Sequence, residues 1–109
     1  MLGETVGTIS VSGSGYLITR VNNINGITVT EYPETVITHI HLISGGTASV
    51  LNIANGQGGT NYIKATCPIV SSGNDFDFGI FGIVFPKGAY VTVDGNIVTA
   101  QITCKANKA

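Results

Sequence analysis

The sequence predicts an all-β protein: a single antiparallel β-sandwich, jelly-roll-like, with eight or nine short strands. The chain has 14 Ile, 11 Val and 13 Thr but only 4 Leu, and side chains branched at Cβ suit a pleated strand better than a helix. It also has 15 Gly and 9 Asn in 109 residues, and both types tolerate the positive φ angles that many tight turns require. Short β-rich runs separated by turn signals are typical of sandwiches.

Turn-forming clusters divide the chain at nearly even intervals. The runs between them predict strands at 6–11, 16–21, 27–32, 36–43, 48–54, 61–66, 76–85, 89–94 and 97–104. The clearest hairpin joins the last two runs, because Asp94-Gly95 is a dipeptide favoured in two-residue turns. The length is that of one domain, 1–109, within which residues 1–34 are open to being an N-terminal arm or an extra hairpin.

Charge is scarce in this chain. Charged residues make up 10% of it and the formal net charge is −1, whereas an average soluble domain has about 25%. A nucleic-acid-binding protein would show a stripe of Lys and Arg, and a membrane span would need an apolar run of about 18 residues. We therefore expect neither nucleic acid nor membrane as a partner.

The predicted strands carry Thr, Ser, Asn and apolar side chains on the face turned away from the core, where Lys and Glu would be usual. An uncharged β surface promotes association, and its edges are adhesive unless they are covered. The sequence therefore predicts a subunit whose faces and edges are occupied by neighbours.

The N-terminal residues 1–5 lack the basic and apolar regions of a secretory signal, so we expect synthesis in the cytoplasm. The chain has two cysteines, Cys67 and Cys104. Reduced thiols are the expectation in that compartment, with a Cys67–Cys104 bridge as the alternative if their strands are neighbours.

The pair His39 and His41 is the most conspicuous candidate site, because a spacing of two places both imidazoles on one face of a strand. The spacing resembles the metal-binding strand of the cupins, but position 33 is Pro where that pattern has Gly, and no acid follows until Asp75. We therefore predict no metal site, and we expect His39 and His41 to lie at a possible subunit interface. Protonation near pH 6 would then loosen that contact.

The run Asp75-Phe76-Asp77-Phe78 alternates carboxylates with aromatic rings. Paired carboxylates can hydrolyse glycosides, but no companion base lies nearby in the sequence. We expect the rings to pack at the edge of the core and the aspartates to meet water, backbone amides or a lysine. Nucleotide-binding and nucleophile-elbow motifs are also missing from the sequence, so we expect no enzyme, no catalytic residues and no cofactor.

Four segments resemble small β-sandwich virion proteins of tailed bacteriophages. They are DFDFG at 75–79, VFPKGAYVTVDGNIVT at 84–99, THIHL at 38–42 and GGTA at 45–48. The resemblance covers roughly residues 35–104. It implies a decoration (cement) protein of the capsid or a fibre or tail accessory protein, and it supplies no site residues.

Composition and resemblance together predict a non-enzymatic phage virion protein, synthesised in the host cytoplasm. Its expected partners are copies of itself, as a homotrimer, and the major capsid protein, because shells present three-fold axes where weak contacts add. The alternative is a fibre, spike or tail module that recognises a host-surface glycan. Such a module would use exposed groups such as Asn55, Gln57, Asn61 and Tyr62.

Overall fold

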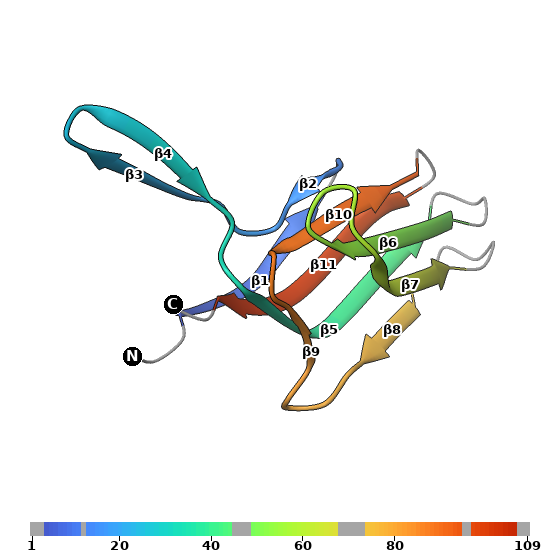
Figure 1. The fold of residues 1–109 in the computed structure, drawn as a ribbon. Coiled ribbons are helices and arrows are strands. Elements are labelled where there is room, and N and C mark those ends of the chain that lie inside the picture. Colours follow the sequence, from blue (N-terminus) through green and yellow to red (C-terminus); the bar gives the residue numbers. More distant parts are fainter. Residues whose placement is uncertain (1–3, 12, 45–48, 68–73, 95–96, 107–109) are drawn as a thin grey trace.

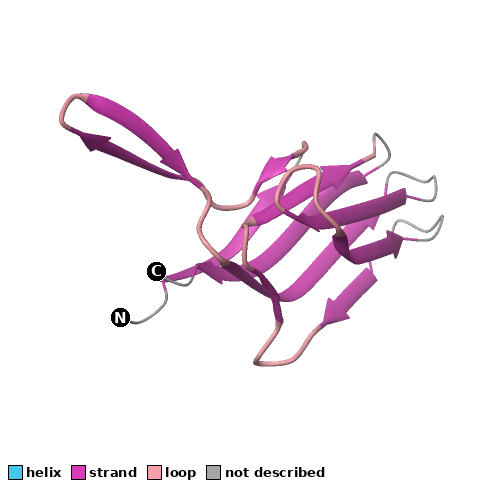
Figure 2. Ribbon diagram, viewed as in Figure 1, coloured by secondary structure: helices cyan, strands magenta, loops and turns pink. Residues whose placement is uncertain are grey.

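The computed structural model describes residues 4–11, 13–44, 49–67, 74–94 and 97–106. Within these ranges every regular element is a β-strand, which confirms the predicted all-β class (Figure 2). Two antiparallel sheets pack against each other, and a two-stranded hairpin stands clear of both (Figure 1). The molecule is accordingly elongated, with extents of 50 × 28 × 22 Å.

The strands follow one another along the chain with short connections. They are β1 (Glu4–Val11), β2 (Gly15–Tyr16), β3 (Arg20–Ile24), β4 (Ile27–Glu31), β5 (Thr35–Ser44), β6 (Ser49–Asn55), β7 (Asn61–Cys67), β8 (Asn74–Asp77), β9 (Ile83–Phe85), β10 (Ala89–Val93) and β11 (Ile97–Ala106).

Along the chain, single strands or pairs of strands belong in turn to one sheet and then to the other. One has the order β1-β11-β5-β8, with β9 also paired to β5, and the other has the order β2-β10-β6-β7. We call them sheet A and sheet B. The chain passes repeatedly from one sheet to the other, an interleaving compatible with the predicted jelly roll. The turn predicted at Asp94-Gly95 joins β10 to β11, but its residues 95–96 lie outside the described part of the chain.

The core lies between the sheets and is made mainly of aliphatic side chains from both. Its buried members are Ile37, Ile40, Leu42, Leu51, Ile53, Ile63, Ala65, Phe85, Ala89, Val91, Ala100, Ile102 and Cys104. Alternation along each strand turns these side chains inward, because successive residues of a strand point to opposite faces. Phe76 and Phe78 pack against the edge of this cluster, as the sequence predicted.

Two of the predicted strands are interrupted. The run 16–21 divides into β2 and the start of β3, and β3 continues through Asn22 and Asn23, which the sequence placed in a turn. The run 76–85 divides into β8 and β9, because the backbone between them turns at Gly79 and Gly82, with φ of 80° and 63°. At Gly82 a Cβ would lie 2.5 Å from the carbonyl oxygen of Ile37, so only glycine fits this close approach.

A β-bulge in β5 changes which side chains enter the core. Ile37 pairs with Cys104 and His39 with Thr103, so Thr38 is an extra residue on this strand. The Thr38 hydroxyl donates to the Thr103 carbonyl, at 3.3 Å. Strict alternation would put Ile37 and His39 on one face. The bulge instead turns Ile37 into the core and leaves His39 partly exposed.

Cys104 is a free thiol in the core, so the alternative of a Cys67–Cys104 bridge is not realised. Burial raises the pKa of the Cys104 thiol to about 11, because the apolar surroundings disfavour the thiolate. Cys67 ends β7, and its side chain lies outside the described part of the structure.

The β3–β4 hairpin leaves the sandwich through a fixed base. Its turn is Asn25-Gly26, with φ of 52° and 79°, the left-handed geometry that suits a two-residue hairpin turn. The base is fixed by Tyr16 and Tyr32, one before and one after the hairpin, whose rings stack 3.7 Å apart. Gly88, at φ 88°, lies against both tyrosines.

We expect Gly88→Ala to lower the free energy of unfolding by about 1–3 kcal/mol, the usual cost of a strained backbone position. The added Cβ would lie 3.0 Å from Cβ of Tyr32 and 3.3 Å from the Tyr16 ring. Gly58→Ala is a matched control, because Gly58 has φ 79° but its Cβ would meet nothing within 4 Å. Urea unfolding should show the larger loss for Gly88→Ala, and equal losses would mean that the tyrosine contact carries no weight.

Candidate functional site

The structure places His39 and His41 beside Asp75 on the outer face of sheet A. The pairing of β5 with β8 sets His41 directly opposite Asp75. One carboxylate oxygen of Asp75, Oδ1, lies 2.7 Å from Nδ1 of His41 and 3.1 Å from Nε2 of His39. A carboxylate only accepts hydrogen bonds, so each imidazole donates from the named nitrogen. We call these three residues the His–Asp–His cluster.

The cluster is exposed to solvent: the side chains of His39, His41 and Asp75 are 39%, 31% and 63% exposed. Hydrogen bonds from His41 and His39 hold the pKa of the Asp75 carboxyl below its ordinary value of 3.8. The second aspartate of the run, Asp77, accepts instead from the backbone N–H of Gly79, at 2.9 Å. The two carboxylates therefore have separate partners and form no acid–base pair.

We expect Asp75→Asn to lower the melting temperature at pH 7 and to have a smaller effect as the pH falls below 3.8. The folded-state pKa of Asp75 lies below its unfolded value of 3.8. Its contribution to stability is therefore present above pH 3.8 and is lost as the pH falls through the folded pKa. Thermal unfolding of both proteins between pH 7 and pH 2 measures this, with Asp77→Asn as control. A difference of the same size at every pH would refute the expectation.

The His–Asp–His cluster has few of the neighbours that catalysis needs. Beside it, Thr38, His39, Asp77, Gly79 and Ile80 line an open hollow of about 400 Å³. The one hydroxyl there, on Thr38, already donates to the backbone of β11. Across the described residues, no group of three or more His, Cys, Asp or Glu is arranged to hold a metal ion. The cluster links the edge strand β8 to β5 and forms a polar patch on the outer face of sheet A.

Of the four residues considered for glycan binding, Asn55 and Tyr62 have side chains that are hydrogen-bonded within the chain. The Asn55 side chain donates to the Tyr62 hydroxyl, at 3.2 Å, and accepts from the backbone N–H of Lys87, at 2.8 Å. The hydroxyl of Tyr16 accepts from the N–H of Gln57, at 2.8 Å. Asn61 lies exposed at the start of β7. The side chains of Asn55 and Tyr16 therefore hold the turn after β6 in place through hydrogen bonds.

The second candidate surface is the β3–β4 hairpin. Within the described part of the chain its strands pair with each other and with no other strand, so neither outer edge of the hairpin has a partner strand there. Three of its apolar side chains are exposed: Val21 by 62%, Ile24 by 55% and Ile27 by 66%. Three edges of the sandwich are shielded in the usual ways, since β2 has two residues, β8 has four and β7 carries the exposed Lys64, whereas β1 is a longer edge strand of eight residues. The hairpin therefore exposes strand edges and apolar side chains together.

Sequence reasoning missed the His–Asp–His cluster. For residues 1–34 it left an extra hairpin as one of two alternatives and predicted the strand at 27–32, but it did not predict β3 as the partner of that strand. Asp75 lies 34 residues beyond His41, and local alternation does not tell which strands become neighbours. For the hairpin, the Asn25-Gly26 dipeptide was the available signal. It was merged with Asn22 and Asn23 into one long turn, which hid the strand that those residues form.

Comparisons with protein-family models, with curated proteins and with solved structures found no match. In the described part of the chain, no helix is present that is long and apolar enough to cross a membrane.

Proposed function

We propose that this chain is a non-enzymatic structural subunit of a tailed-phage virion. In this proposal it is a decoration protein that forms a homotrimer and binds the major capsid protein on the outer surface of the head. The observation that carries the proposal is the β3–β4 hairpin. A two-stranded hairpin is marginally stable by itself in water, and this one exposes Val21, Ile24 and Ile27 well away from the sandwich (Figure 1). Such an element is expected to be covered by a partner.

The outer face of sheet A supports the same reading. The hydroxyls of Thr8 on β1 and Thr103 on β11 are hydrogen-bonded to each other, at 3.0 Å. Ser10 and Gln101, the next pair on this face, extend the polar, uncharged surface. His39 and His41 lie at its far side and are proposed as part of a subunit or shell contact. Surfaces of this kind make individually weak contacts, which a repeated shell and a symmetric oligomer would sum by avidity.

The alternative, a fibre, spike or tail module that binds a host glycan, is less well supported. It would need free polar and aromatic groups on the turn after β6, and the side chain of Asn55 there is already bonded on both its nitrogen and its oxygen. Binding to a glycan array, lost in Tyr62→Ala, would favour this alternative over decoration.

Cosedimentation with purified heads tests the proposed function. The chain is expected to pellet with heads in a saturable way, at a ratio fixed by the number of three-fold positions on the shell. Bovine serum albumin added at the same concentration should stay in the supernatant and serves as the control. A chain that also stays in the supernatant would contradict the decoration role.

A further inference from the structure

The side of the sandwich between β1 and β2 is open and forms a cleft. β1 is the edge of sheet A and β2 the edge of sheet B. With two residues, β2 pairs with only Tyr90 and Val91 of the five-residue β10. The cleft has a volume of about 310 Å³ and is lined by Ile9, Ser10, Val11, Gly13, Ser14, Gly15, Tyr16 and Leu17.

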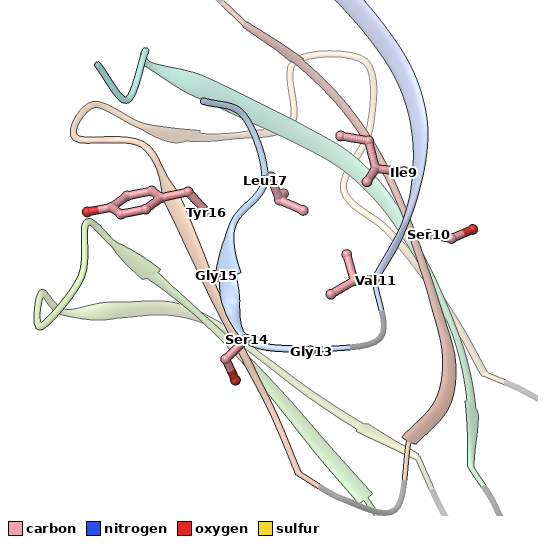
Figure 3. Close-up of a pocket in the computed structure, with 8 residues that line it drawn as sticks. All are labelled: Ile9, Ser10, Val11, Gly13, Ser14, Gly15, Tyr16 and Leu17. Atoms are coloured by element: carbon pink, nitrogen blue, oxygen red, sulfur yellow. The ribbon is translucent and has the colours of Figure 1, made fainter. Parts of the chain in front are cut away.

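Both polar and apolar groups line this cleft, and its apolar part comes from three side chains. Figure 3 shows the side chains of Ile9, Val11 and Leu17 pointing into it, while those of Ser10 and Ser14 point away. All three apolar side chains pack against the core and remain partly exposed. The lining contains no Asp, Glu, Lys or Arg. The cleft is therefore suited to an uncharged aliphatic group.

The hairpin tip offers such a group. Ile24 and Ile27 are directly opposite each other in the β3–β4 register, so both side chains lie on one face of the hairpin. The turn between them, Asn25-Gly26, is uncharged. The tip and the cleft are thus matched in polarity, and burying both would remove apolar surface from water on both sides.

The tip cannot reach the cleft of its own chain. The hairpin starts at Arg20, three residues after Leu17, and its base is fixed by the stacked rings of Tyr16 and Tyr32. Five residues at about 3.3 Å each carry the tip some 15 Å beyond that base. Figure 1 shows the hairpin directed away from the sandwich. The cleft of a second copy is therefore the matching surface for the tip.

We propose that Ile24 and Ile27 of one copy insert into the cleft between β1 and β2 of a second copy. The inference rests on the proposed homo-oligomer and names its contact. The register of β1 with β11 is regular from Thr8 to Val11, so this stretch of edge can accept a strand of the incoming hairpin. Donor and acceptor surfaces differ, so the contact is head-to-tail, and the proposed homotrimer requires that three such contacts close into a ring.

Disulfide trapping tests the contact. Ile24→Cys and Val11→Cys are made as separate variants, each with Cys67→Ser, while the buried Cys104 is left in place. Coexpressed and mildly oxidised, the two variants are expected to form a mixed disulfide dimer, and each variant alone should form none. Dimers of Ile24→Cys alone would overturn the proposal, because hairpins would then meet each other. A wild-type oligomer without mixed dimers would overturn it as well.

A second measurement separates this inference from the proposed function. Ile24→Asn with Ile27→Asn is expected to weaken self-association at least tenfold in light scattering, with an unchanged circular dichroism spectrum. Phe81→Asn, at an 85% exposed site outside both surfaces, should leave association intact. If the double variant still assembles and wild type still binds heads, the inference fails and the proposed function stands. If wild type neither assembles nor binds heads, both fail.

Discussion

Replacing Phe85 by alanine should lower the free energy of unfolding by about 3–5 kcal/mol, the usual cost of truncating a buried aromatic ring. Phe85 is 0% exposed and is the largest of the fully buried side chains in the described core. Its ring lies 5.4 Å from that of Tyr62, so β9 of sheet A is packed through it against β7 of sheet B. The free energy of unfolding of a small domain is only about 5–15 kcal/mol, so this one substitution should remove a large share of the total stability.

The matched control for Phe85→Ala is Val84→Ala, on the same three-residue strand but 42% exposed. Val84→Ala should lower the free energy of unfolding by less than about 1 kcal/mol, because substitutions at the surface usually change it by about 0.5 kcal/mol or less. Urea unfolding followed by circular dichroism compares the two variants. Similar losses for both would mean that the two sheets do not share the core described above.

Removing the β3–β4 hairpin should abolish self-association and leave the sandwich folded. Residues 20–31 are replaced by Gly-Ser-Gly, which joins the segments that carry Tyr16 and Tyr32. Among the described residues the hairpin strands pair with no strand of the sandwich, so we expect a melting temperature within a few degrees of wild type. The deletion variant should be monomeric, because it lacks the exposed tip of the hairpin. Light scattering and thermal unfolding measure the two results.

The control for the hairpin deletion is Thr28→Ala, on the hairpin face opposite Ile24 and Ile27. It should assemble like wild type. An oligomer that survives deletion would place the contact elsewhere on the molecule, and Ile80 and Phe81, which are 81% and 85% exposed, would then be the next candidates. A deletion variant that unfolds would show that the hairpin supports the sandwich.

Much of this fold could be predicted from local patterns in the sequence. Runs rich in Val, Ile and Thr between turn residues were sufficient for β5, β6, β7, β10 and β11, each found within two residues of its predicted bounds. Local patterns did not predict the features of the fold that depend on contacts between residues far apart in the sequence. The break at Gly82 exists because the backbone passes close to Ile37, and the bulge at Thr38 exists because β11 accepts its hydroxyl.

The candidate surfaces were less accessible to sequence reasoning. Alternation put His39 and His41 on one face, but the partner that bonds them, Asp75, comes from a strand whose position depends on the whole sheet order. The same holds for the cleft, which exists because β2 is short beside β10. Neither the length of β2 nor its place in sheet B follows from the few residues that form it.

The mass of the intact protein in solution tests the central claim most directly. The claim is that this weakly charged sandwich, with its uncovered hairpin, works as an assembled subunit. Multi-angle light scattering during size-exclusion chromatography should give three times the chain mass of 11.3 kDa, and the ratio should hold as the sample is diluted through the micromolar range. A soluble species of 11.3 kDa that persists at high concentration would contradict the claim.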